Sequence, residues 1–374
     1  MRKIPVSQPV LGAEESEAVN AALRGGELSG NFGSFIPEFE RKFSDFCGCA
    51  HGVAVSNGTT ALHLPLAAMG IKAGDEVLVS TLTNMATFFA VLYQGAVPVP
   101  VDIEPDTLNM DPALLEGLVT PRTRAILVVH LFGHPVDMDP VLAVAKKHKL
   151  LVIEDCAEAH GALYKGRKVG GLGDAGCFSF YANKIITTGE GGMVTCTDAA
   201  LAAKMRSLKA LAFGDKLKFM HKDLGYNYRL TNLQAAIGCA QMGKIEDIIG
   251  NKRRIAAYYA SKLAGVGELQ LPVEKPYARN VHWMYHIVLR NRDLEQRTGI
   301  MRFMAEKGIE VREGFIPYNL QEVFISRGLV RPEACPEANK VAYNSFYLPS
   351  GPVLSEEDMD YVVETLKAAL ARAK

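Results

Sequence analysis

A lysine between two apolar segments has the clearest chemical potential of any side chain in this sequence. Lys184 follows the apolar run 176–180. A turn rich in glycine and threonine, residues 187–192, separates it from the next apolar run, 193–195. Partial burial in such a tight segment would lower the pKa of the lysine and supply the free amine that a Schiff base requires. A lysine that only neutralises a nearby carboxylate would fit the same pattern.

An acidic residue ends another apolar segment. Asp155 follows Glu154 at the end of the aliphatic run Leu150–Ile153. In open α/β sheets ligands bind at the carboxyl ends of the strands, so Asp155 is expected where chemistry takes place. An acid at this point could pair with a cationic ligand, coordinate a metal or cap a helix.

A third segment suits a phosphate group. Ser56-Asn57-Gly58-Thr59-Thr60 lies between an apolar run and a helical pattern. Backbone N–H groups at a helix start bind anions, although many such turns only cap a helix. A phosphate cradle, an acid at a strand end and a lysine in a tight turn are together the groups that pyridoxal phosphate (PLP) needs. The acid would keep the pyridine nitrogen protonated, and the lysine would carry the cofactor as a Schiff base and later move a proton.

The elements that must position these groups alternate between strand and helix patterns. From about residue 50 to 210 this alternation predicts an α/β domain with a largely parallel sheet. Consecutive apolar residues at 127–129 and 150–153 are typical of strands buried on both faces. The predicted strands are 52–55, 76–79, 97–101, 125–130, 150–153, 176–180 and 192–195, and the predicted helices between them are 60–69, 86–93, 112–118 and 140–147.

The pattern changes after Leu230. Apolar residues recur at helical spacing to about residue 263, and a proline-bearing stretch, 271–276, follows. A last helix is predicted over Ser355–Ala371, with a serine N-cap and three acids in its first turn. We predict a large α/β domain in residues 1–250 and a small α+β domain in residues 251–374.

The overall composition excludes several classes of partner. Lys+Arg and Asp+Glu each total 41, so a net charge of zero gives no global attraction to nucleic acid or anionic membranes. The N-terminus lacks the apolar region of a signal peptide, and no apolar run is long enough to span a membrane. Seven cysteines without a C-x-x-C pair indicate reduced thiols and no metal site. We expect a cytoplasmic protein without nucleic-acid or membrane partners.

Five ordered sequence blocks carry a resemblance to a known family. They are Val55-Ser56-Asn57-Gly58-Thr59, the segments 129–134 (VHLFGH) and 152–159 (VIEDCAEA), the segment 183–193 (NKIITTGEGGM) and the segment 225–232 (GYNYRLTN). Through these blocks the chain resembles, essentially end to end, the DegT/DnrJ/EryC1/StrS family of sugar-nucleotide aminotransferases. The resemblance implies the fold type I architecture of PLP-dependent aminotransferases, and the cofactor pyridoxal 5'-phosphate.

The resemblance also implies a role for each matching position. Lys184 matches the Schiff-base lysine, Asp155 the partner of the pyridine nitrogen, and Glu158 a residue near the ring hydroxyl. Gly58, Thr59 and Ser179 match phosphate contacts. Asn227 matches an asparagine that reaches the phosphate from the neighbouring subunit, which implies a homodimer with shared active sites. Substrate contacts are expected from Arg229, from Arg312 and from the loop that carries Asn319.

The implied reaction transfers an amino group from glutamate to a nucleotide-linked 4-keto-6-deoxy sugar. The segment 183–193 resembles most the branch that converts GDP-4-keto-6-deoxymannose to GDP-perosamine. Related dehydratases have histidine at the lysine position, so Lys184 favours transamination. Two departures leave a UDP- or dTDP-linked acceptor, or amination at C3, as alternatives: Asn84 replaces a ring-stacking aromatic residue, and Asn319 replaces a histidine. Phe88 or Phe89 could supply the missing aromatic face.

The sequence also disfavours two functions outside this enzyme class. A PLP-binding regulator without turnover is disfavoured by the intact set of Lys184, Asp155 and Ser179. A nucleotide-dependent oxidoreductase would fit the alternation of strands and helices. It is disfavoured because no G-x-G-x-x-G follows the first predicted strand.

Overall fold

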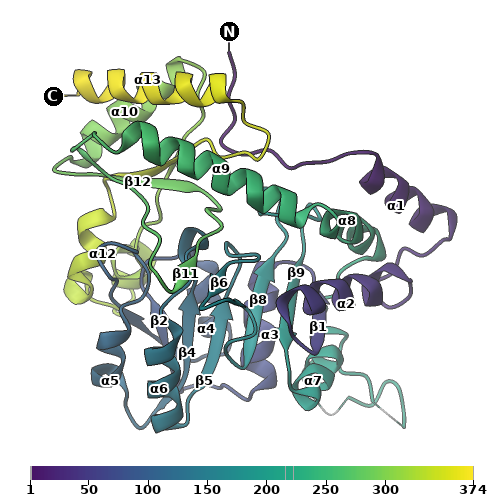
Figure 1. The fold of residues 1–374 in the computed structure, drawn as a ribbon. Coiled ribbons are helices and arrows are strands. Elements are labelled where there is room, and N and C mark those ends of the chain that lie inside the picture. Colours follow the sequence, from purple (N-terminus) through teal and green to yellow (C-terminus); the bar gives the residue numbers. More distant parts are fainter. Residues whose placement is uncertain (1, 215, 222, 374) are drawn as a thin grey trace.

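A seven-stranded sheet forms the centre of the molecule in the computed structural model, which describes residues 2–214, 216–221 and 223–373 (Figure 1). The strand order is β1-β9-β8-β5-β4-β2-β3. Only the pairings of β9, with β1 and with β8, are antiparallel among the described strands of this sheet. The other six strands therefore share one direction, and their carboxyl ends meet at one edge.

The strands of this sheet are β1 (His51–Val55), β2 (Glu76–Ser80), β3 (Val97–Val101), β4 (Thr123–Val129), β5 (Leu151–Asp155), β8 (Ala175–Ser179) and β9 (Gly192–Cys196). A four-stranded sheet, in the order β10-β12-β14-β13, contains β10 (Leu269–Gln270), β12 (Tyr285–Leu289), β13 (Arg312–Glu313) and β14 (Ser345–Leu348). A small three-stranded sheet contains β6 (Leu163–Tyr164), β7 (Arg167–Lys168) and β11 (Ala278–Arg279).

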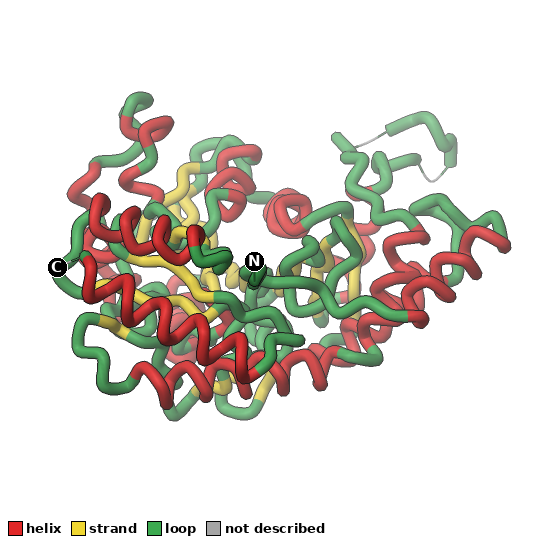
Figure 2. Tube along the Cα trace, turned by 90° about the horizontal axis from the view of Figure 1, so that it is seen from above, coloured by secondary structure: helices red, strands yellow, loops and turns green. Residues whose placement is uncertain are grey.

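The helices surround these sheets. The α-helices are α1 (Ala13–Arg24), α2 (Phe35–Cys47), α3 (Gly58–Ala68), α4 (Ala86–Tyr93), α5 (Leu115–Leu118), α6 (Met138–His148), α7 (Ala199–Lys209), α8 (Asn232–Met242), α9 (Ile245–Leu263), α10 (Leu294–Glu306), α11 (Glu322–Ile325), α12 (Pro336–Val341) and α13 (Glu356–Arg372). Short 3-10 turns are η1 (Pro112–Leu114), η2 (Leu131–Gly133), η3 (Tyr318–Leu320) and η4 (Pro332–Ala334). Seen from above, helices lie outside the strands (Figure 2).

The consecutive apolar residues explain the depth of the central strands. Every residue of β2, β8 and β9 is buried, as expected for strands covered by helices on both faces. The α/β fold class is confirmed, and the seven central strands lie within one or two residues of their predicted positions. The last helix, α13, also begins where predicted, because the Ser355 hydroxyl accepts the N–H of Asp358.

The apolar side chains form two clusters that meet along α9. Ile245, Ile248 and Ile249 in its first turns belong to the core around the seven-stranded sheet. Ile255 and Tyr259 belong to the second cluster, with the four-stranded sheet, α10 and α13. The boundary at residue 250 remains a prediction, because helix α9 continues through it.

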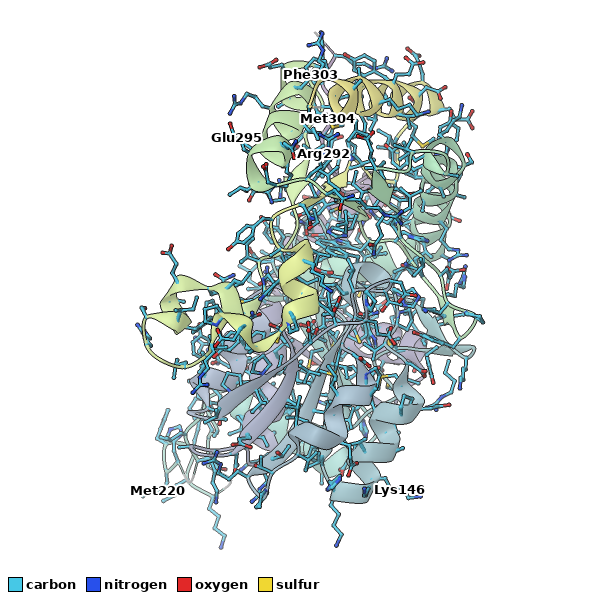
Figure 3. The ribbon with its side chains drawn as sticks, turned by 90° about the vertical axis from the view of Figure 1, so that its left-hand side faces the viewer. Lys146, Met220, Arg292, Glu295, Phe303 and Met304 are labelled. Carbon is cyan, nitrogen blue, oxygen red and sulfur yellow. The ribbon has the colours of Figure 1, made fainter. Side chains whose placement is uncertain are left out.

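The second cluster lies at one end of the molecule. Phe303 and Met304 of α10 lie beside α13, at the end opposite Lys146 and Met220 (Figure 3). Met304 is fully buried, and the Arg372 guanidinium lies 4.4 Å from the centre of the Phe303 ring. None of the described helices is long and apolar enough to cross a membrane.

Candidate active site

A cavity of about 1060 Å³ lies at the carboxyl ends of the parallel strands. It collects residues at or just after the ends of β1, β2, β4, β5 and β8, together with residues of the C-terminal third of the chain. The lining residues are Asn57, Gly58, Thr59, Leu62, Thr83, Asn84, Ala86, Thr87, Val129, Asp155, Ala157, Glu158, Ser179, Tyr181, Asn183, Lys184, Glu190, Trp283, Arg312, Phe315 and Tyr347. Seven of the ten predicted site residues thus line one cavity.

The first turn of α3 forms the anion-binding part of the cavity. Asn57 caps the helix by accepting the N–H of Thr60 at 2.9 Å, and α3 begins at Gly58. The first N–H groups of a helix have no acceptor within it, so those of Gly58 and Thr59 are available to a ligand. Gly58 also permits the close approach of β8, because a β carbon at this position would lie 2.7 Å from Cβ of Ser179.

Asp155 is the last residue of β5, and local hydrogen bonds fix its carboxylate. The residue is 5% exposed. Oδ1 accepts the N–H of Ala157 at 3.1 Å, and Oδ2 accepts the hydroxyl of Thr87 at 2.9 Å. Burial raises the pKa of Asp155, whereas these hydrogen bonds and the charge of Lys184 lower it. The fixed carboxylate faces the cavity and can hold a cationic ring nitrogen.

Lys184 lies in the connection between β8 and β9. Its side chain is 13% exposed, and Nζ makes no hydrogen bond to a described residue. The amine lies 3.9 Å from Oε1 of Glu158 and 4.0 Å from the centre of the Trp283 ring. Burial lowers the pKa of Lys184, while Glu158 and Asp155 raise it. The site can therefore supply a free amine near neutral pH more readily than a surface lysine could.

Glu158 is buried beside this amine. Its Oε2 accepts the N–H of Phe132 at 2.8 Å. Burial raises the pKa of Glu158 to about 7, although the charge of Lys184 acts in the opposite direction. A buried carboxylate and amine with opposed pKa shifts are typical of a site that exchanges protons.

Glu154, the residue before Asp155, is a buried carboxylate whose charge is explained by hydrogen bonds within the fold. His130, Glu154 and Cys156 are the one group of three potential metal ligands that lie together within residues 2–214, 216–221 and 223–373. Glu154 is already saturated: its oxygens accept hydrogen bonds from the backbone of Gly170, Leu172 and Gly173 and from His130. These bonds explain the buried charge without an ion. The expectation that the protein binds no metal stays a prediction.

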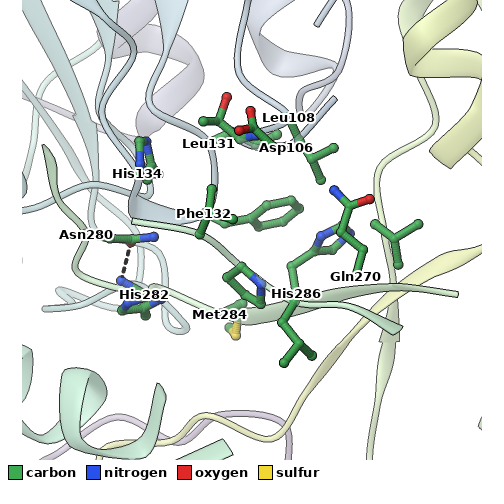
Figure 4. A pocket seen from close by; sticks show the side chains of 15 residues that line it. Asp106, Leu108, Leu131, Phe132, His134, Gln270, Asn280, His282, Met284 and His286 are labelled. Carbon is green, nitrogen blue, oxygen red and sulfur yellow. Dashed lines mark hydrogen bonds between the residues drawn. The ribbon is translucent and has the colours of Figure 1, made fainter. Parts of the chain in front are cut away.

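A second, smaller cavity of about 400 Å³ lies nearby (Figure 4). It is lined by His134, His282, His286 and Phe132 among others. Burial lowers the pKa of His282 to about 4 and that of His286 to about 3, so both imidazoles are neutral. The residues described as lining this cavity include no lysine and no carboxylate at the end of a parallel strand. The larger cavity therefore remains the candidate active site.

Three predicted site residues lie outside the larger cavity in this chain. Asn227 is exposed and Arg229 is half-buried, both before α8. Asn319 is fully buried and makes three hydrogen bonds: it accepts one from Thr81 and donates two, to Pro332 and Asn339. The prediction that Asn319 contacts substrate is therefore wrong for this structure, since its polar groups are used within the fold.

The aromatic substitutes expected for Asn84 were also wrong. Asn84 lines the cavity, but neither Phe88 nor Phe89 is among the described lining residues. Phe88 is fully buried and stacks on Tyr318 with ring centres 3.9 Å apart. The aromatic lining instead comes from Tyr181, Trp283, Phe315 and Tyr347, none of which was predicted from the sequence to lie in the site. The one feature of the sequence that could have pointed to Trp283 is that it is the single tryptophan of the chain, about 100 residues after Lys184.

The residues of the cavity fit PLP. The unpaired N–H groups at the start of α3, the fixed carboxylate of Asp155 and the amine of Lys184 border one space. They match the phosphate, the pyridine nitrogen and the aldehyde carbon of the cofactor in charge and hydrogen bonding.

Comparisons with known proteins identify the family. Residues 9–367 match the model of the DegT/DnrJ/EryC1/StrS aminotransferase family. The chain is 44% identical to the GDP-perosamine synthase of Caulobacter vibrioides, over 98% of both chains. It is 36% identical to the dTDP-3-amino-3,4,6-trideoxy-alpha-D-glucose transaminase of Streptomyces venezuelae, over 96% of this chain and 92% of that one.

A solved structure agrees with this assignment. The PLP form of a sugar aminotransferase from Streptococcus pneumoniae matches with a TM-score of 0.94 and 27% identity, over 100% of both chains. The chain therefore belongs to the DegT/DnrJ/EryC1/StrS aminotransferase family and is a PLP-dependent sugar aminotransferase.

Proposed function

We propose that this enzyme transfers the amino group of glutamate to C4 of GDP-4-keto-6-deoxymannose, forming GDP-perosamine and 2-oxoglutarate. One observation carries the proposal: Lys184, Asp155 and the first turn of α3 border a single cavity. The 44% identity to a GDP-perosamine synthase over 98% of both chains supports the choice of acceptor.

Each residue of the cavity has its own role in the proposed reaction. Lys184 carries the cofactor and moves a proton at the amine-bearing carbon. Asp155 holds the pyridine nitrogen, and its hydrogen bonds to Thr87 and Ala157 keep the carboxylate in place. Gly58, Thr59 and Ser179 bind the phosphate, and Glu158 lies near the ring hydroxyl. When bound, PLP supplies the electron sink for the reaction.

The active enzyme is a homodimer in this proposal. Asn227 is exposed and does not reach the cavity of its own chain, so the proposal assigns it to the phosphate of the partner subunit's site. Large apolar side chains near it are strongly exposed, which is typical of a surface that another chain covers. They are Leu217, Phe219, Met220 and Leu224.

Arg312 is a proposed substrate contact. Its guanidinium lines the cavity, is half exposed, and pairs with Glu310 at 3.0 Å. It is placed to meet a diphosphate or the carboxylate of glutamate. Arg229 lies outside this cavity, so its proposed contact would be with the partner's site. We place the enzyme in the cytoplasm, consistent with seven unpaired cysteines in the described chain.

A UDP- or dTDP-linked acceptor, or amination at C3, is the second candidate. Asn84 favours it, because this residue lines the cavity and differs from the aromatic residue expected there. The change at Asn319 no longer bears on the acceptor, since that side chain is buried in the fold.

An absorbance titration separates these candidates. PLP-loaded protein is mixed with glutamate and then with GDP-, UDP- and dTDP-linked 4-keto-6-deoxy sugars, with the absorbance of the lysine-bound cofactor followed. We expect glutamate to bleach that band and GDP-4-keto-6-deoxymannose to restore it. Recovery only with a UDP- or dTDP-linked sugar would disprove the acceptor, and no bleaching by glutamate would contradict the proposed donor half-reaction.

A further inference from the structure

The only tryptophan of the chain lies against the amine of Lys184. Nζ is 4.0 Å from the centre of the Trp283 ring, and the residue is 3% exposed. A cation over the face of an indole is stabilised by the ring quadrupole, more strongly when water is excluded. The position of Trp283 therefore favours the charged form of a lysine whose burial favours the neutral form.

Three hydrogen bonds hold Trp283 in this position. The indole N–H donates to the carbonyl of Asn183 at 2.8 Å, the residue before Lys184. The backbone N–H of Trp283 donates to the carbonyl of Phe132 at 3.0 Å. The carbonyl of Trp283 accepts from the buried amine of Lys252 at 2.8 Å. Both the ring and the backbone are thus fixed relative to the segment that carries Lys184.

Phe132 connects Trp283 to the acid on the other flank of Lys184. Its carbonyl accepts from Trp283, and its N–H donates to Glu158 at 2.8 Å. Phe132 has φ of +52°, in the left-handed region that side chains with a β carbon rarely adopt. Phe132 therefore adopts an uncommon backbone conformation where it orients both Trp283 and Glu158, the two neighbours of the Lys184 amine.

We propose that Trp283 is a positioning residue for the proton-transfer step, holding the released amine of Lys184 between its ring face and Glu158. The inference rests on the role of Lys184 proposed above and deepens it. When the lysine leaves the cofactor, its side chain could adopt many rotamers. The ring gives the ammonium form a fixed location in the cavity, and Glu158 gives it a counter-charge.

Several other titratable groups lie around this amine or line the same cavity. Asp155 acts on it through its charge, and His160, which is buried and neutral with a pKa of about 3, lies close enough for Lys184 to influence its titration. Glu190 and Arg312 line the same cavity. A test must therefore change the face of the ring while these groups and the size of the side chain stay the same.

Fluorinated tryptophan meets that requirement. Since the chain has a single tryptophan, biosynthetic incorporation of mono-, di- and trifluorinated tryptophan alters position 283 alone. Fluorine withdraws electron density from the ring face and leaves the indole N–H in place. The pKa of Lys184 is measured in the full-length, cofactor-free protein, from the pH dependence of its acylation, with mass spectrometry of the peptide that carries it.

We expect the pKa of Lys184 to fall stepwise along the series, by about one unit at three fluorines, since a desolvated cation–π contact has that order of magnitude. In point variants, W283F keeps a ring face and should hold the pKa nearer to the unsubstituted value than W283L. Lys146, which is exposed on α6, is the internal reference in every sample.

A pKa of Lys184 that stays within about 0.2 units across the fluorinated series would overturn the inference. Equal values in W283F and W283L would do the same, and the fluorinated series decides if W283L does not fold. Neither glutamate nor sugar is present, so a wrong choice of acceptor would leave these results unchanged. Conversely, an unchanged pKa of Lys184 across the fluorinated series would not alter the result expected from the absorbance titration with glutamate.

Discussion

Replacing Glu158 by glutamine should lower the pKa of Lys184. Glutamine has nearly the same shape, and its side-chain oxygen can still accept the N–H of Phe132 that now lies 2.8 Å from Glu158. The substitution removes the charge 3.9 Å from Nζ and leaves the packing in place. The ammonium form of Lys184 then loses a counter-ion, whereas the neutral form loses little.

The distance between Nζ of Lys184 and Oε1 of Glu158 sets the size of the expected pKa shift. Two unit charges 3.9 Å apart attract by about 4 kcal/mol at an effective dielectric constant of about 20, which corresponds to about 3 pKa units. This is an upper limit, because Glu158 has a raised pKa of about 7 and is partly protonated near neutral pH. Opposite charges at such distances shift a pKa by about 1–3 units, and we expect the drop in E158Q to fall in this range.

Acylation of the cofactor-free protein measures this shift directly. The rate of modification of Lys184 is followed from pH 6 to 11 in the unsubstituted protein and in E158Q, with an exposed lysine as reference. D155N is the matched comparison: Asp155 lies beyond salt-bridge distance of the amine, so its loss should shift the pKa less. An E158Q profile within about 0.3 units of the unsubstituted one would refute the assigned ion pair.

Three further substitutions have defined outcomes. In G58A the new β carbon would lie 2.7 Å from Cβ of Ser179, so the dissociation constant of PLP in a fluorescence titration should rise about 10- to 100-fold. N319A should lower the free energy of unfolding in urea by about 2–4 kcal/mol, because the buried partners of three hydrogen bonds lose their partner. KM for the sugar should stay unchanged. Burial lowers the pKa of Lys252 to about 7 from the ordinary 10.5, so the folded protein binds fewer protons than the unfolded one between those values, and stability rises with pH there. K252M should flatten that rise in thermal melts between pH 7 and 9; an equal slope in both proteins would contradict the assignment.

Local sequence determined much of the fold and the cofactor half of the site. The apolar run of β5 ends at Asp155 and that of β8 ends at Ser179, and parallel strands bring both ends to the same edge. The turn before α3 could be recognised because Asn57 and Thr60 are close in sequence and cap each other. In each case the interaction that positions the residue is local.

The other half of the site depends on contacts between distant segments. Trp283 and Phe132 are about 150 residues apart, and only the paired backbones of their segments bring both to Lys184. The helical phase of α4 turns Phe88 into the core against Tyr318 and away from the cavity. Neither arrangement has a local pattern in the sequence, because the partner that decides it is remote.

The most direct test of the account is the chemical identity of the residue that carries the cofactor. PLP-loaded protein is reduced with borohydride, which makes the lysine–cofactor bond permanent, and its peptides are analysed by mass spectrometry. The account predicts one modified peptide, with the reduced cofactor on Lys184, and no such adduct in K184A. An adduct on another lysine, or none in a protein that holds PLP, would contradict it.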